Sequence, residues 1–220
     1  MKKIILYVHG KGGSSQEANE FVKNLHGFDI LGVDYDDSYL PQIVMPQIRA
    51  AYNTAHKTHD KIYILANSIG AYFAMLSLQG FNITKALFIS PVVDMEGLML
   101  NMMKSAGVSE EDLRSRGEIV TSFGETLSWE YLRFVRENPI SWDVHTEILY
   151  AEGDKLISRQ SIENFINTHN AGLTIMHGGE HWFHTDEQIA FLIHWLINIL
   201  IDSCEASRNI RRTLVTSVMS

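Results

Sequence analysis

The segment Ile62-Tyr63-Ile64-Leu65-Ala66-Asn67-Ser68-Ile69-Gly70-Ala71-Tyr72 is the most informative stretch of the sequence. Its first part is rich in aliphatic and aromatic residues and predicts a buried strand, and the part after Ser68 predicts a helix. Ser68 stands at the junction, with Ala66 two residues before it and Gly70 two residues after it. Small-x-Ser-x-Gly between a strand and a helix predicts a sharp turn that exposes the serine hydroxyl. The alternative is that Ser68 simply caps an ordinary helix.

The same alternation of strand and helix continues along most of the chain. Strands are predicted at 3–8, 29–33, 61–66, 85–90, 147–151 and 173–176. Helical spacing of apolar residues is found at 16–25, 40–55, 69–78 and 189–199, and Pro46 either kinks the second of these helices or starts it. The pattern predicts an α/β fold with a mainly parallel sheet of about six strands flanked by helices.

One segment interrupts this alternation. Residues 95–144 separate two predicted strands and are mostly helical in pattern, so we expect a small helical cap inserted into the α/β core. The core is then formed by residues 1–94 and 145–203. Residues 204–220 have weak periodicity and are expected to form a C-terminal tail.

Composition excludes several classes of protein. The formal net charge is −8 and the sequence has no dense Lys/Arg stripe, so we expect no nucleic-acid partner. Cys204 is the only cysteine, which excludes intrachain disulfides and Cys-rich zinc sites. The apolar run before His9 is too short for a signal peptide, and no apolar stretch is long enough to span a membrane. A cytoplasmic location is therefore expected.

A glycine-rich loop, His9-Gly10-Lys11-Gly12-Gly13-Ser14-Ser15, follows the first predicted strand. Its glycines allow backbone amides to face a developing negative charge, and we assign the oxyanion donors to the amides of Lys11 and Ile69. The loop could instead form a plain tight turn or bind a phosphate. Its spacing matches neither phosphate-binding glycine motif, so nucleotide binding is the weaker interpretation.

An acid and a base follow the last two strands. Asp154 ends the segment Leu149–Asp154, at the carboxyl edge of the sheet, although it could also be a simple turn or helix-capping residue. His181 lies in the loop after the last strand, where two glycines precede it. His177 and His184 flank His181, but no carboxylate cluster completes a metal site, so no metal is expected. The chain order Ser…Asp…His is that of one family of serine hydrolases.

With these residues the chain resembles the α/β-hydrolase superfamily, in particular its small bacterial serine hydrolases and esterases. The resemblance covers about residues 3–200 and is carried by His9-Gly10, 66–70, Gly153-Asp154 and 179–181. It implies a Ser68–His181–Asp154 triad, a two-amide oxyanion hole, no cofactor, and a cap formed by the insertion. It also makes Asp94 a second candidate acid, because some members carry their acid at that place. Ala66 differs from the family pattern, which usually has a glycine two residues before the serine.

The resemblance implies hydrolysis of a small-molecule ester or thioester of an acyl group through an acyl-enzyme. Aminopeptidase, amidase or C–C bond hydrolase activity on the same triad stays open, as does a non-catalytic binding module. The methionines of the cap suggest an acyl-chain pocket, although the simpler interpretation is that they are core residues of a cap helix. The candidate substrate contacts are His9, Gly10, Asn67, Met95, Met99 and Trp182.

Overall fold

A computed structural model of the chain describes residues 1–200. Six strands form one sheet in the order β2-β1-β3-β4-β7-β8, and each neighbouring pair is parallel. These strands are β1 (Lys3–Val8), β2 (Asp29–Gly32), β3 (Lys61–Asn67), β4 (Lys85–Ile89), β7 (Thr146–Ala151) and β8 (Ala171–Met176). The mainly parallel six-stranded sheet predicted from the sequence is therefore confirmed.

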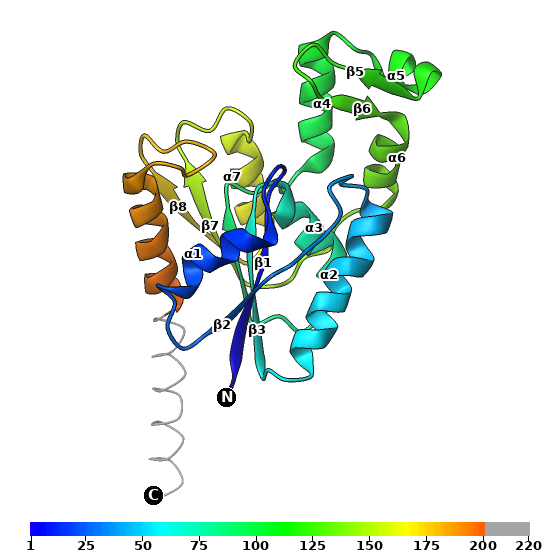
Figure 1. The fold of residues 1–220 in the computed structure, drawn as a ribbon. Coiled ribbons are helices and arrows are strands. Elements are labelled where there is room, and N and C mark those ends of the chain that lie inside the picture. Colours follow the sequence, from blue (N-terminus) through cyan, green and yellow to red (C-terminus); the bar gives the residue numbers. More distant parts are fainter. Residues whose placement is uncertain (201–220) are drawn as a thin grey trace, which may run out of the picture.

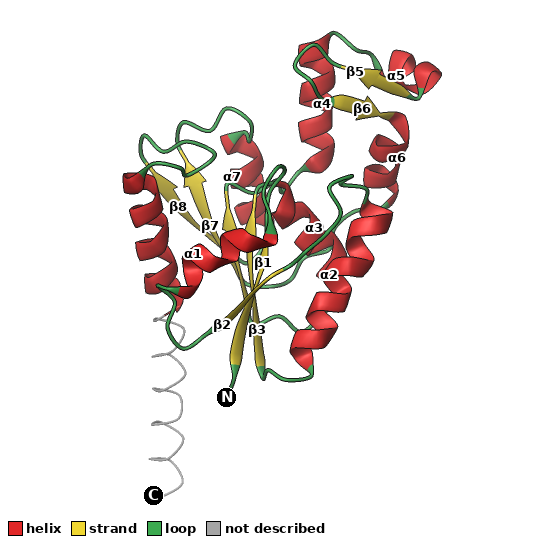
Figure 2. Cartoon of the chain, in the orientation of Figure 1, coloured by secondary structure: helices red, strands yellow, loops and turns green. Residues whose placement is uncertain are grey.

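Helices cover both faces of this sheet (Figure 2). One face packs against α2 (Pro41–His56), α3 (Ile69–Leu78) and α7 (Arg159–Thr168), and the other against α1 (Ala18–Val22) and a last helix over 186–200. Because successive side chains of a strand point to opposite faces, β1 contributes to both layers. Leu6 and Val8 pack in the first layer and Ile5 and Tyr7 in the second.

The insertion between β4 and β7 stands apart from the sheet (Figure 1). Its elements are α4 (Met95–Ala106), α5 (Glu110–Arg116), β5 (Glu118–Val120), β6 (Thr126–Ser128) and α6 (Trp129–Glu137). Arg136 of α6 holds the three helices together, because its guanidinium donates to Glu110 of α5 at 2.7 and 2.8 Å and to Glu96 of α4 at 2.7 Å. Residues 95–137 are called the cap.

The cap contains a short antiparallel hairpin, β5–β6, in addition to the predicted helices. Strands of three residues are too short to show a period of two in the sequence. The hairpin turn is fixed instead by two hydrogen bonds to the Glu125 carbonyl, one from the Thr121 amide and one from the Thr121 hydroxyl, and by Gly124, whose φ of 87° favours glycine.

The first two predicted helices differ from those in the structure. Helix α2 begins at Pro41 and continues through Pro46. Of the two alternatives that the sequence left open, a helix that starts at Pro46 is therefore wrong. The predicted helix over 16–25 is a 3₁₀ turn, Ser15–Glu17, followed by the short α1. Cys204 and the proposed tail, 204–220, lie outside the described residues. No helix within 1–200 has the length and apolarity needed to cross a membrane.

Candidate active site

Ser68 occupies a strained turn between β3 and α3. Its φ of 51° and ψ of −122° lie in a region that residues with a side chain rarely adopt. The surrounding backbone holds this conformation from both sides, since the Ser68 amide donates to the Ile89 carbonyl and the Ser68 carbonyl accepts from the Val92 amide, each at 3.0 Å. Strain of this kind persists only where neighbouring structure fixes it, and it is concentrated at functional sites.

Small residues around Ser68 allow three segments to approach closely. A Cβ atom at Gly70 would lie 2.3 Å from the His9 carbonyl oxygen, and one at Gly10 would lie 3.2 Å from Ser68 Cβ. Ala66 is fully buried on the core side of β3. The glycine that is usual at that position is therefore not needed here, whereas Gly70 is required by the contact with β1.

His181 reaches Ser68 from the loop after β8. Its Nε2 lies 3.0 Å from Ser68 Oγ, although 113 residues separate them in the sequence. The loop is held by the Gly153 amide, which donates to the Gly179 carbonyl at 2.9 Å, and by the buried ring of Phe183. His181 itself is buried, so its ring is fixed against the serine rather than free in solvent.

Asp154 binds the other nitrogen of the imidazole, with Oδ2 lying 2.6 Å from His181 Nδ1. A carboxylate can only accept, so Nδ1 carries the hydrogen and Nε2 is left to accept the Ser68 proton. Asp154 Oδ1 accepts from the amides of Leu156 and Ile157 at 2.8 and 2.9 Å. Burial raises the pKa of Asp154, but these hydrogen bonds and the one from His181 outweigh it, so the net pKa is lowered.

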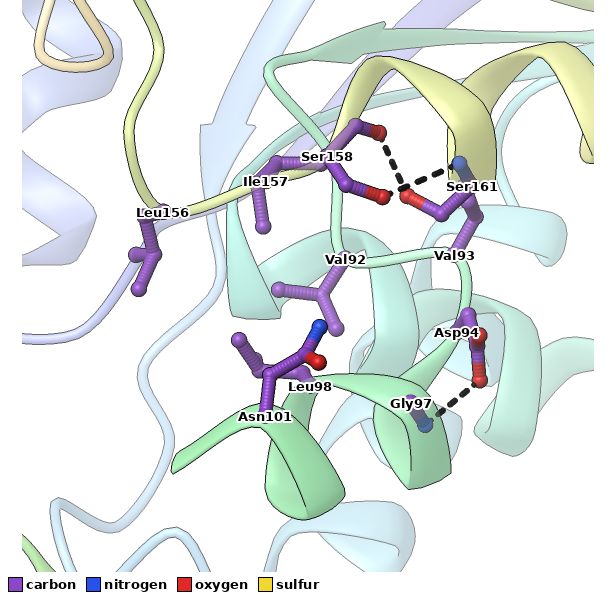
Figure 3. A pocket seen from close by; sticks show the side chains of 10 residues that line it. All are labelled: Val92, Val93, Asp94, Gly97, Leu98, Asn101, Leu156, Ile157, Ser158 and Ser161. Atoms are coloured by element: carbon purple, nitrogen blue, oxygen red, sulfur yellow. Dashed lines mark hydrogen bonds between the residues drawn. The ribbon is translucent and has the colours of Figure 1, made fainter. Parts of the chain in front are cut away.

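The second candidate acid, Asp94, has a different role. Its carboxylate accepts from the Gly97 amide at 2.8 Å and caps the N-terminus of α4. It lines a depression of about 40 Å³ beside the start of α7, which shares Val92, Leu98 and Leu156 with the cavity that contains Ser68 (Figure 3). A depression of that volume holds only a few water molecules.

The two histidines that flank His181 in sequence do not join it. His177 Nδ1 lies 3.3 Å from Glu152, and His184 Nδ1 lies 3.5 Å from Glu180. Among residues 1–200, no three His, Cys, Asp or Glu side chains are grouped so that they could hold a metal ion.

The two amides assigned to the oxyanion hole belong to residues that lie beside Ser68. Ile69 is the first residue of α3, and the first amides of a helix have no acceptor within it. Lys11 follows Gly10, which packs against Ser68. Tyr39 supports the loop, because its hydroxyl accepts from the Gly12 amide at 2.8 Å. Lys11 and Ile69 line the same cavity as Ser68 and His181.

This cavity is a cleft of about 900 Å³ between the core and the cap. The apolar residues on the cap side of the cleft are Met95, Leu98, Met99, Met102, Leu127 and Tyr131, and the hairpin adds polar groups there, including Glu118 and Glu125. The core side adds Tyr39, Leu40, Leu156 and Trp182. Three of the six candidate substrate contacts, Met95, Met99 and Trp182, therefore line the cleft together with Ser68.

The other three candidate contacts lie outside the cleft lining. His9 is buried with its ring stacked on Tyr35 at 4.1 Å, and Gly10 packs against Ser68. Asn67 is the last residue of β3 and stands directly before Ser68. These three residues therefore lie beside the turn and the glycine-rich loop rather than in the cleft lining, and their role as substrate contacts stays a prediction.

Leu98 and Met102 belong to the apolar cap residues that suggest an acyl-chain pocket, and they share one face of α4 with Met95 and Met99. Other cleft residues were not identified from the sequence. Tyr39, Leu127 and Leu156 come from separate loops and strands, and no local pattern places them together.

The chain was compared with protein families, curated proteins and solved structures, and only the solved structures are similar to it. No protein-family model matches the sequence, and no curated protein matches it. Solved structures do match. Est1E from Butyrivibrio proteoclasticus has a TM-score of 0.74 at 16% identity, over 93% of this chain and 88% of Est1E. Alpha/beta hydrolase domain-containing protein 10 from mouse has a TM-score of 0.69 at 15% identity, over 91% of this chain and 90% of that one.

A third structure, the esterase domain of a Rhodothermus marinus protein, has a TM-score of 0.63 at 12% identity, over 88% of this chain and 84% of that one. At such identities the likeness concerns the fold, and it agrees with the strand order and the helical layers of this chain. The chain has the α/β-hydrolase fold.

Proposed function

We propose that this protein is a serine hydrolase that cleaves a carboxylic ester or thioester through an acyl-enzyme intermediate. The observation that carries the proposal is the continuous chain of contacts from Asp154 through His181 to Ser68, at 2.6 and 3.0 Å. A serine hydroxyl becomes a good nucleophile only when an oriented base takes its proton, and these distances allow that transfer.

In the proposed reaction Ser68 Oγ attacks the carbonyl carbon while His181 Nε2 takes the hydroxyl proton. The amides of Lys11 and Ile69 stabilise the oxyanion of the tetrahedral intermediate. As the intermediate collapses, His181 gives its proton to the leaving alcohol or thiol. A water molecule, deprotonated by His181, then attacks the acyl-enzyme and releases the acid. Asp154 holds the imidazole in the required tautomer throughout, and no step needs a cofactor.

The comparisons support a hydrolase in general. The similar structures include proteins described as an esterase domain and an alpha/beta hydrolase domain-containing protein. The fold alone does not select the bond that is cleaved, because the same scaffold carries many reactions. The ester or thioester is proposed from the triad and the apolar cleft beside it.

A fluorophosphonate probe tests the nucleophile directly, because it phosphonylates an activated serine. We expect the native protein to be labelled and Ser68→Ala to be unlabelled, with His181→Ala strongly slowed. Ser158→Ala is a matched control, because Ser158 caps α7 outside the cleft. No labelling of the native protein would favour a binding module. Faster turnover of aminoacyl p-nitroanilides than of p-nitrophenyl esters would replace the esterase proposal by an amidase.

A further inference from the structure

We infer that the cleft selects acyl groups that are uncharged and apolar, and that it discriminates against acyl groups carrying a negative charge. This inference rests on the proposed function, since it assigns a substrate class to the same serine. It is carried by two observations on the cleft lining: a continuous apolar face of α4 and an excess of carboxylates among the charged residues.

The apolar face consists of Met95, Leu98, Met99 and Met102, which we call the α4 stripe. These positions follow the i, i+3, i+4, i+7 spacing of one helix face, and all four line the cleft that contains Ser68 and His181. Methionine side chains are flexible and adapt to irregular apolar surfaces. An alkyl chain attached to the reacting carbonyl can therefore lie along this stripe.

Each methylene group that leaves water against such a surface should raise kcat/KM about fourfold, until the stripe is covered. Trp182 and Leu156 stand on the core side of the cleft and are 62% and 42% exposed. They provide the second apolar wall of the cleft, opposite the cap.

The charged residues of the cleft are mostly acidic. Its lining contains four carboxylates, from Asp37, Glu118, Glu125 and Glu180, and two ammonium groups, from Lys11 and Lys155. One ammonium is already matched, because Lys11 forms an ion pair with Glu125. The lining therefore has a net negative charge, and the whole chain carries a formal charge of −8.

A negative lining repels an anionic acyl group and attracts a cationic one. Asp37 and Glu118 are solvent-exposed, so their electrostatic effect on a charged acyl group should be strong at low ionic strength. It should fade as salt shortens the Debye length from about 30 Å at 0.01 M to about 3 Å at 1 M. Burying a carboxylate or an ammonium group against the α4 stripe adds a cost that salt does not remove, which favours the uncharged chain over both.

The test compares p-nitrophenyl esters of acetic acid, octanoic acid, octanedioic acid and 8-aminooctanoic acid. We expect kcat/KM for the octanoate to exceed that for the acetate by at least about tenfold. At about 0.01 M salt the ammonium ester should be hydrolysed at least about fivefold faster than the carboxylate ester, and this ratio should approach one at about 1 M.

Two substitutions and a matched control locate the effect. Asp37→Asn and Glu118→Gln should each lower the ammonium-to-carboxylate ratio, whereas Glu20→Gln, an exposed acid on α1 outside the cleft, should not. Fluorophosphonate labelling and turnover of the acetate ester test the proposed function separately. Suppose that labelling and acetate turnover both succeed. If kcat/KM for the carboxylate ester then equals that for the octanoate, or if the ammonium-to-carboxylate ratio does not change with salt, this inference alone is overturned. If both fail, it falls together with the proposed function.

Discussion

The ammonium group of Lys11 forms an ion pair with the carboxylate of Glu125, and this pair joins the loop after β1 to the hairpin of the cap. The two residues are 114 positions apart in the sequence and both line the cleft. The side chain of one proposed oxyanion donor is thus paired with a hairpin that lines the same cleft.

The ion pair should contribute little to overall stability, because its side chains are 51% and 34% exposed. A double-mutant cycle with Lys11→Met and Glu125→Gln, measured by urea unfolding, should give a coupling energy of about 1 kcal/mol or less. The coupling should disappear at about 1 M salt. A coupling energy that stays the same at high salt would show that the two side chains interact by more than charge.

Gly70 should tolerate no side chain. Gly70→Ala places a Cβ atom 2.3 Å from the His9 carbonyl oxygen and 2.4 Å from that of Val8, so the start of α3 must move away from β1. We expect a loss of more than about 2 kcal/mol in urea unfolding and slower fluorophosphonate labelling of Ser68.

Gly80→Ala is the matched control for this substitution, because Gly80 has a φ of 77° and open space around its Cβ position. Its cost should be that of backbone strain alone, about 1–2 kcal/mol, without an effect on labelling. If Gly70→Ala instead stabilised the helix, as alanine does at an unconstrained helical site, the close approach of α3 to β1 would be refuted.

Asp154 should make stability depend on acid pH. A carboxyl group with a lowered folded pKa stabilises the fold above its unfolded pKa, about 3.9, and loses this contribution as the pH falls through the folded value. The stability difference between the native protein and Asp154→Asn should therefore shrink as the pH is lowered from about 5 to below about 3.9. Urea unfolding across this range measures it, and a constant difference would contradict the lowered pKa.

Two methionines of α4 should separate substrate binding from packing. Met99 lines the cleft, whereas Met103 faces the core outside the cleft lining, and both are more than nine-tenths buried. Substituting either by alanine should cost about 2–5 kcal/mol of stability. Only Met99→Ala should lower the ratio of kcat/KM for p-nitrophenyl octanoate to that for the acetate. An equal fall of this ratio in Met103→Ala would mean that the cap as a whole, rather than the α4 stripe, determines it.

The local elements could be read from the sequence because each depends on contacts within one segment. The strand and helix on either side of Ser68, the turn between them and the alternation along the chain all follow from residue spacing. The β5–β6 hairpin could not be read in this way, because its strands are only three residues long. The local pattern also did not decide whether α2 continues through Pro46 or begins there.

The sequence by itself determined the parallel α/β architecture, since the periods of two and 3.6 are local properties of strands and helices. It also determined which serine stands at a strained turn, because the small residues around Ser68 are its neighbours in the chain. Only the tertiary structure decided that Asp154 and not Asp94 contacts His181, and that Met99 faces the cleft while His9 does not. Those choices depend on distances between segments far apart in the sequence, and the packing of layers sets these distances.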